Sequence, residues 1–278
     1  MSRTLTILAA QTRPVPFDAE ATFAKFEREV RMLTGAFPHA DLLIFPELYL
    51  TGEDPFTPGP PRYEHLVAEE IPGPLTDRVA KVAERAGRHI VAGSMFERKG
   101  EDIFNTALVA SPDGELVATY RKLFPWRPWE TTAPGDRIVT FDVPAGRIGL
   151  MICYDGWFPE VARSLAARGA EVIVQPSLTT TPDREEEIVL ARAHAIANQV
   201  YVVNPNAAST IGGGRSVAVD PEGRLLFEAG PGEEFLLEVL DLERVGTVRE
   251  LGTRGLNRVW EHFHEAPPAA MEAYRRPS

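Results

Sequence analysis

The sequence has little of several residues that mark particular classes of protein. It has one cysteine in 278 residues, so it cannot form an internal disulfide, and we expect a reducing, cytoplasmic compartment. It has no run of about 18 apolar residues and no signal-peptide layout, so no membrane-spanning segment is predicted. A formal net charge of -11 argues against nucleic acid or an anionic membrane surface as a partner. This charge is compatible with a small neutral substrate.

Two kinds of catalytic site also find no support in the sequence. There is no Gly-x-Ser-x-Gly motif, which argues against a serine hydrolase of the nucleophile-elbow type. Histidine occurs six times, and only His262 and His264 are close together. One such pair makes a poor metal site. We therefore predict neither a metal nor another cofactor.

The order of apolar segments predicts the fold class. Short apolar runs bounded by turn residues indicate strands, and apolar residues at helical spacing between them indicate helices. In two places, 106–120 and 216–227, the pattern changes to paired strands joined by Pro-Asp-Gly and Pro-Glu-Gly turns. Alternation that changes to hairpins and back predicts an α/β layered sandwich, with mixed sheets inside and helices outside. Other expected strands are 5–10, 41–45, 89–92, 138–143, 146–153, 172–174 and 200–203.

Helix boundaries follow from capping residues. Asp18 is a good N-cap for a helix that Gly35 would end. Thr181 followed by Pro182 predicts the start of a later helix, on which Ile188, Val189, Ala193 and Ile196 recur. No linker is long enough to divide the chain, so we expect one domain over residues 1–248. The tail 249–278 mixes aromatic and charged residues, and we expect it to pack on a partner subunit.

The stretch that contains the only cysteine reads as a buried strand followed by a sharp turn. The segment 148–152 is apolar on both faces, as a central covered strand would be. Cys153 ends it, Gly156 permits an unusual backbone shape, and a helix is expected to begin near Pro159. A thiol at this position lies near a helix N-terminus, which favours negative charge. Most cysteines at the end of an apolar strand are nevertheless inert core residues.

Two further ionisable residues directly follow apolar strands. Glu47 comes after 42–46, and Lys122 comes after 116–120. Open α/β sheets place their sites at such strand ends. Either residue alone is more often a solvated surface charge. Together with Cys153 they are the parts of a thiol hydrolase that lacks histidine: a carboxylate takes the thiol proton and later returns it to a leaving amine, while an ammonium stabilises the thiolate and the oxyanion.

Three blocks carry a resemblance to a known family. Phe-Pro-Glu at 45–47, Tyr-Arg-Lys at 120–122 and Ile-Cys-Tyr-Asp-Gly at 152–156, the last followed by Phe-Pro-Glu at 158–160, resemble the signature blocks of the nitrilase (carbon–nitrogen hydrolase) superfamily. The likeness covers roughly residues 3 to 242. It implies a four-layer αββα sandwich that dimerises, and a Glu47–Lys122–Cys153 triad that works through a covalent thioester or thioimidate.

The resemblance also assigns secondary roles. The block 122–130 is similar to that of aliphatic amidases and formamidases, in which Glu130 would position the substrate or Lys122. The backbone N–H of Tyr154 would complete the oxyanion hole. Trp126, Trp129 and Trp157 are candidates to line an acyl pocket, although tryptophans are more often core or interface residues.

The turn after the cysteine bears on the substrate. Hydrolases of N-carbamoyl amino acids and of ω-amides tend to carry arginine there, to hold a substrate carboxylate. This sequence has Gly156 and Trp157 instead, which indicates an uncharged substrate end. We predict an amidase that releases ammonia from a small neutral carboxamide. The alternatives are a nitrile or N-carbamoyl hydrolase, or a catalytically silent binding or assembly module, for which the intact triad offers no support.

Overall fold

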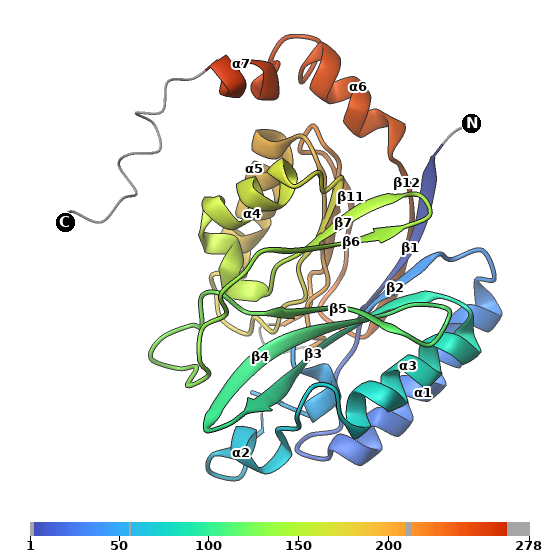
Figure 1. Cartoon of the computed structure of the whole chain (residues 1–278), viewed down its shortest axis with the longest axis vertical. Helices are drawn as coiled ribbons and strands as arrows, with labels where there is room; N and C mark the ends of the chain where they lie inside the picture. Colours follow the sequence, from blue (N-terminus) through green and yellow to red (C-terminus); the bar gives the residue numbers. More distant parts are fainter. Residues whose placement is uncertain (1–2, 56, 210–212, 266–278) are drawn as a thin grey trace.

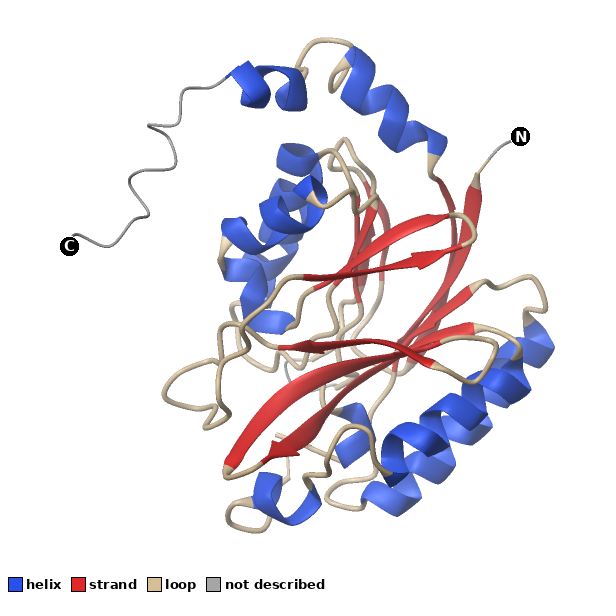
Figure 2. Ribbon diagram, viewed as in Figure 1, coloured by secondary structure: helices blue, strands red, loops and turns tan. Residues whose placement is uncertain are grey.

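A computed structural model describes residues 3–55, 57–209 and 213–265 (Figure 1). Two mixed six-stranded sheets lie face to face, and helices cover their outer faces (Figure 2). The predicted αββα sandwich is therefore confirmed. The first sheet has the order β12-β1-β2-β3-β4-β5, with bounds Glu234–Asp241, Thr4–Gln11, Leu42–Ile44, His89–Lys99, Asp102–Ala110 and Leu116–Arg121. The second has the order β11-β10-β9-β8-β7-β6, with bounds Leu225–Glu228, Val217–Val219, Tyr201–Asn204, Val172–Val174, Gly146–Leu150 and Val139–Val143.

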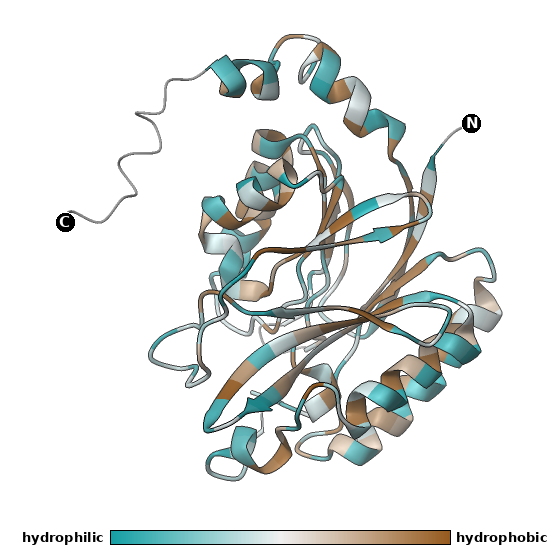
Figure 3. Cartoon of the chain, viewed as in Figure 1, coloured by the Kyte–Doolittle hydropathy of each residue, from teal (hydrophilic) through white to brown (hydrophobic). Residues whose placement is uncertain are grey.

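Each sheet is buried on both faces in its central strands. In β2, Leu42 and Ile44 point into the core between the sheets, whereas Leu43 points into the core under the helices, and all three are fully buried. This arrangement explains why the central strands read as unbroken apolar runs. Figure 3 shows hydrophobic residues along the strands of both sheets and hydrophilic residues interspersed on the helices. Full burial of one such side chain contributes roughly 1.5–3 kcal/mol.

The helices lie outside the sheets in two pairs. Helices α1 (Ala19–Ala36) and α3 (Pro74–Ala86) cover the first sheet, and α4 (Pro159–Ala167) and α5 (Arg184–Asn198) cover the second (Figure 1). Short helices and turns complete the structure: η1 (Tyr49–Thr51), α2 (Tyr63–Val67), η2 (Cys153–Trp157), α6 (Glu243–Leu251) and α7 (Val259–Glu265).

Two helix boundaries differ from the predictions. Asp18 does cap α1, because its carboxylate accepts the N–H of Ala21 at 2.9 Å. Gly35 does not end that helix, which continues to Ala36 and closes where Phe37 N–H bonds the carbonyl of Leu33. Helix α5 begins at Arg184 rather than at Thr181. The Thr181 hydroxyl bonds the side chain of Asp183, the N-cap residue, so the cap lies further along the chain than the Thr-Pro pair suggested.

The C-terminal segment packs, as far as the structure describes it, on its own chain. The division predicted after residue 248 falls inside α6, which ends at Leu251. In α7, Trp260 donates its indole N–H to the carbonyl of Asn198 at 3.0 Å, and the Arg163 guanidinium lies 4.9 Å from the centre of its ring. Residues 266–278 lie outside the described residues, so their packing on a partner stays a prediction. Within the described residues, no helix is both long and apolar enough to cross a membrane.

A bulge in β3 brings two strands into unusually close contact. The pairing of β3 with β4 shifts register between Val91 and Ser94, and Gly93 has a φ of +75°. A Cβ atom at Gly93 would lie 1.9 Å from the carbonyl oxygen of Pro46, the residue before Glu47. The next residue, Ser94, accepts the backbone N–H of Leu48 on its hydroxyl oxygen at 2.8 Å. Glycine at 93 therefore fixes the backbone on both sides of Glu47.

We predict that Gly93→Ala destabilises the fold by about 3 kcal/mol or more, because the new methyl group collides with backbone that has no room to move. Gly100→Ala is the matched control: its φ is also positive, at +63°, but nothing lies within 4 Å of its added Cβ. Gly100→Ala therefore loses only the ease with which glycine adopts a positive φ, which costs about 1 kcal/mol of stability. Urea unfolding of both variants measures the difference, and equal losses would contradict the close-contact argument.

Candidate active site

Cys153 begins the sharp turn η2, which follows strand β7. Its φ is +43°, a left-handed conformation that residues with a side chain seldom adopt. Backbone bonds hold it there: Cys153 N–H donates to the carbonyl of Pro176 at 3.0 Å, and its own carbonyl accepts the side-chain amide of Gln175 at 2.8 Å. The sequence assigned the unusual backbone to Gly156, but the left-handed residue is the cysteine itself. Gly156 is needed because a Cβ there would lie 2.3 Å from Gln175 Nε2.

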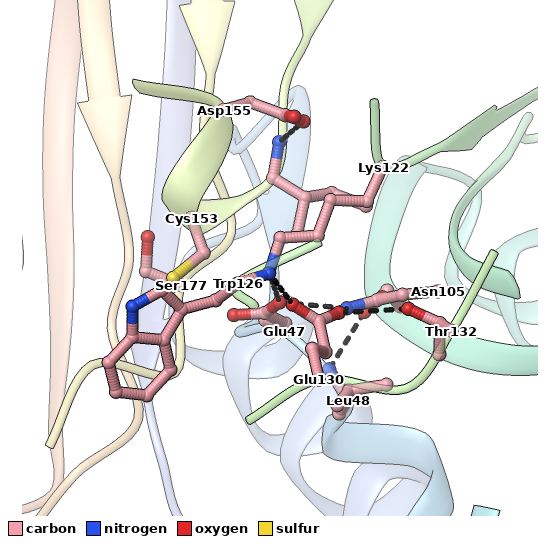
Figure 4. Close-up of polar contacts among 12 residues, drawn as sticks. Glu47, Leu48, Asn105, Lys122, Trp126, Glu130, Thr132, Cys153, Asp155 and Ser177 are labelled. Carbon is pink, nitrogen blue, oxygen red and sulfur yellow. Dashed lines mark hydrogen bonds and ion pairs between the residues drawn. The ribbon is translucent and has the colours of Figure 1, made fainter. Parts of the chain in front are cut away.

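Lys122 lies between two carboxylates beside this turn (Figure 4). Its Nζ donates to Glu47 Oε1 at 2.9 Å and to Glu130 Oε2 at 2.7 Å. The side-chain amide of Asn105 donates to both glutamates, at 2.8 Å to Glu47 and 3.1 Å to Glu130. The Lys122 and Glu47 side chains are 3% and 4% exposed, which makes this a buried, hydrogen-bonded charge cluster.

Burial and mutual attraction determine the protonation of the cluster. Burial raises the pKa of Glu47, although Lys122 partly opposes the rise. Burial alone would lower the pKa of Lys122, but the negative charges of Glu47, Cys153 and Glu130 raise it well above its ordinary value. Burial also tends to raise the pKa of Glu130, but attraction to the Lys122 ammonium outweighs burial, and the pKa is lowered. Lys122 and Glu130 therefore form a persistent ion pair, and Glu47 is the carboxylate placed to exchange a proton.

The Cys153 thiol completes the group. It lines one cavity with Glu47, and its proximity partly offsets the rise in the pKa of that carboxylate. Cys153 is partly accessible through a cavity but otherwise surrounded by protein, so burial raises the pKa of its thiol well above the ordinary value, with Glu47 adding to the rise and Lys122 opposing it. The thiol thus needs a base to become a nucleophile, and Glu47, whose pKa burial raises, lines the same cavity.

A cavity of about 200 Å³ opens onto these residues. Trp126 and Trp129, two of the three tryptophans that the sequence offered as pocket residues, line it together with Tyr154, and Trp129 is 71% exposed. Trp157 is not among the lining residues, and its ring centre lies 6.2 Å from that of Tyr154. Within the described residues, no three His, Cys, Asp or Glu side chains are grouped so that they would hold a metal ion.

Sequence reasoning missed several residues of the site. Asn105 lies directly before the predicted hairpin 106–120 and was assigned no role, yet its amide bridges both glutamates. Thr179 and Glu187 line the cavity on the side of β8 and α5. The threonine run 179–181, in the segment after β8, was the available signal, because β7 and β8 are parallel neighbours whose ends meet at one edge.

Asp155 joins the two strand ends that carry the cluster. Its Oδ2 accepts the Tyr120 hydroxyl at 2.7 Å and the Ile152 N–H at 2.9 Å. Its Oδ1 accepts the N–H groups of Leu123 and Phe124 at 3.1 and 2.9 Å. The side chain is fully buried. Burial raises its pKa to about 6 although all these hydrogen bonds favour the ionised form.

The position of Asp155 fixes the spacing of Lys122 and Cys153. Lys122 follows β5 in the first sheet, and Cys153 follows β7 in the second. The four groups that donate to Asp155 lie next to one or the other in the sequence. One carboxylate therefore connects both strand ends, and the ammonium reaches the thiol only while this connection holds.

We predict that Asp155→Asn lowers the free energy of unfolding by about 2–4 kcal/mol, because an amide turns an N–H toward backbone donors and leaves them unpaired. Amide hydrolysis should fall together with stability. Asp142→Asn removes a mostly exposed carboxylate and should leave both unchanged. Urea unfolding and ammonia release measure the two effects, and full activity in Asp155→Asn would contradict the argument.

Comparison with known proteins identifies the family. The carbon–nitrogen hydrolase family model matches residues 6–250. Omega-amidase NIT2 of Mus musculus is 36% identical over 201 residues, which cover 66% of this chain and 72% of the mouse protein. The Homo sapiens protein of the same name is 35% identical over 207 residues, covering 68% and 74%.

Solved structures agree with the sequence comparison. An amidase from Nesterenkonia sp. AN1, in complex with butyramide, superposes with a TM-score of 0.77 at 25% identity and covers 90% of this chain and 95% of its own. A carbon–nitrogen hydrolase from Helicobacter pylori G27 shares the fold with a TM-score of 0.85 at 23% identity, over 99% of both chains. The chain therefore belongs to the carbon–nitrogen hydrolase family, as its motifs predicted, and it is an amidase that hydrolyses amide C–N bonds.

Proposed function

We propose that Cys153 is the nucleophile, Glu47 the general base and acid, and Lys122 the cation that stabilises negative charge. The observation that carries this proposal is the buried contact of the Lys122 ammonium with Glu47, in a cavity that Cys153 also lines. The three residues come from different strands, and a buried cation and carboxylate are otherwise unfavourable. Their convergence on one cavity is what a histidine-free thiol hydrolase requires.

The first half-reaction forms an acyl-enzyme. Glu47 takes the thiol proton while Sγ attacks the carbonyl carbon, and the carbonyl electron pair moves to oxygen. Lys122 and the Tyr154 N–H stabilise the resulting oxyanion. When the oxyanion collapses, the C–N bond breaks and Glu47 returns its proton to nitrogen, so a primary amide releases ammonia. A thioester on Cys153 remains.

The second half-reaction restores the enzyme. A water molecule gives a proton to Glu47 and attacks the thioester carbonyl. The C–S bond then breaks, the carboxylic acid leaves, and the proton returns to sulfur. Glu130 does not exchange protons in this scheme, because Lys122 lowers its pKa. It holds the ammonium in place together with Glu47.

The charges of the cavity bear on the substrate. Its lining includes Glu53 and Asp183, and the only lysine or arginine among the described lining residues is Lys122, whose charge two carboxylates already neutralise. Burial raises the pKa of Glu53 to about 7, and the nearby Glu64 and Asp54 contribute. A substrate carboxylate would meet repulsion here, which supports the neutral carboxamide that Gly156 and Trp157 suggested.

We also propose a homodimer or higher homo-oligomer in the cytoplasm. Val189 and Ile196 lie seven residues apart on α5, hence on one face, and they are 62% and 41% exposed. The sequence placed both on the apolar face of this helix, and an apolar face left open on a single chain suits a second copy. A reactive thiol is best maintained in a reducing compartment.

We predict that Cys153→Ala abolishes ammonia release and removes the acyl-enzyme adduct seen by mass spectrometry in the wild type, because no other cysteine is present. The variant should keep the fold by circular dichroism and the dimeric mass by light scattering. Matched amides, nitriles and N-carbamoyl compounds, tested with one acyl group, separate the three reactions. Ammonia release by Cys153→Ala at the wild-type rate would exclude the proposed nucleophile.

We predict that kcat/KM for an amide with a terminal carboxylate, relative to its neutral analogue, falls as the pH rises from 6 to 8. The reason is that Glu53, with a pKa of about 7, gains its negative charge in this interval. Glu53→Gln should remove the pH dependence and raise the ratio at pH 8 by about three- to tenfold. Glu250→Gln, an exposed carboxylate on α6, is the control. An unchanged ratio in Glu53→Gln would show that this residue does not select the substrate.

A further inference from the structure

A second group contacts the Cys153 thiol. The hydroxyl oxygen of Thr179 lies 3.6 Å from Sγ, and it also lies 2.7 Å from Glu187 Oε2. Thr179 and Glu187 are both buried. The catalytic scheme above uses neither residue. They extend from the thiol toward α5, whereas Glu47 and Lys122 approach it from β2 and β5 of the other sheet.

The hydrogen-bond partners of Glu187 determine which way the hydroxyl proton of Thr179 points. Glu187 Oε2 also accepts Arg184 Nη1 at 2.8 Å, both side chains are 4% exposed, and Arg184 Nη2 donates to the carbonyl of Arg215 at 2.8 Å. A carboxylate paired with a buried guanidinium is ionised and only accepts hydrogen bonds. The single hydroxyl proton of Thr179 is therefore directed at Glu187. A lone pair of the hydroxyl oxygen is left for the sulfur.

The Thr179 hydroxyl has little freedom to turn. The Thr179 N–H donates to Asn206 Oδ1 at 2.8 Å, and Asn206 Nδ2 donates back to the Thr179 carbonyl at 3.0 Å. The same Nδ2 donates to the carbonyl of Gly214 at 2.9 Å. With the backbone held on both sides and the proton bound to a charged acceptor, the hydroxyl oxygen can accept a proton from the thiol but is poorly placed to donate one to a thiolate.

We propose that Thr179 is a positioning residue that holds Cys153 as a protonated thiol in the resting enzyme. The inference rests on the proposed role of Cys153 as the nucleophile. The groups around the sulfur act in both directions: Lys122 and the Leu178 N–H favour the thiolate, whereas burial, Glu47 and Glu187 oppose it. Thr179 adds an acceptor that only the thiol can use. The thiol then loses its proton to Glu47 only when substrate is bound. Between turnovers the free enzyme therefore reacts slowly with electrophiles and oxidants.

The test is the pH dependence of Cys153 alkylation by iodoacetamide, followed as the mass of the intact protein. The chain has one cysteine, so the signal reports on this thiol alone and does not require catalysis. Thr179→Val keeps the branched shape and removes the acceptor oxygen. We expect its alkylation midpoint to move to lower pH and its rate at neutral pH to rise about three- to tenfold, the effect of losing one hydrogen bond to the neutral form.

Thr179→Ser retains the hydroxyl and should restore the wild-type midpoint. If Thr179→Val does not fold, Thr179→Ala removes the same oxygen and should shift the midpoint in the same direction. A midpoint at higher pH would mean that the hydroxyl donates to the thiolate, and an unchanged midpoint would mean that it does not act on the thiol; either result overturns the proposal. Loss of ammonia release in Cys153→Ala tests the nucleophile separately, so the two failures are distinguishable.

Discussion

The arrangement of the active site depends on one buried carboxylate that is not part of the catalytic triad. Asp155 accepts four hydrogen bonds, and its donors lie on segments from both sheets. In a sandwich the two sheets touch through apolar side chains, and such contacts are non-directional. They set how far apart the sheets lie but do not fix one strand end against another. Directional hydrogen bonds to Asp155 supply that constraint, and they place the Lys122 ammonium beside the Cys153 thiol.

The charge cluster is stable only as a whole. Glu47 and Glu130 carry like charges in a buried region, and each needs Lys122 and Asn105 to satisfy it. Removal of one partner from such a cluster leaves an uncompensated charge away from water, which is strongly unfavourable. The same interdependence divides the roles of the two glutamates. Lys122 lowers the pKa of Glu130 and leaves that of Glu47 raised, so one carboxylate stays ionised while the other is free to exchange a proton.

Sequence reasoning predicted the parts of the site that follow strands and missed those that depend on tertiary contacts. Glu47 and Lys122 follow apolar strands of the first sheet and Cys153 follows one of the second, and α/β proteins place their sites at such strand ends. Nothing local shows that Asp155 bonds residues 123 and 124, or that Asn105 bridges two glutamates. The backbone of Cys153 was missed for the same reason, since distant groups at 175 and 176 hold it in a left-handed conformation. Trp157 was chosen for its residue type, and it is not among the residues that line the cavity.

The surroundings of the sulfur explain how a thiol enzyme can work without histidine. An imidazolium would hold a thiolate permanently. Here the nearest cation is shared by two carboxylates, so its field at the sulfur is weakened, and burial favours the neutral thiol. The nucleophile therefore has to be generated in the step that uses it, by proton transfer to Glu47. That requirement is consistent with a base of raised pKa, because a carboxylate of ordinary pKa would be a poor acceptor for a thiol proton and would not readily return it to nitrogen.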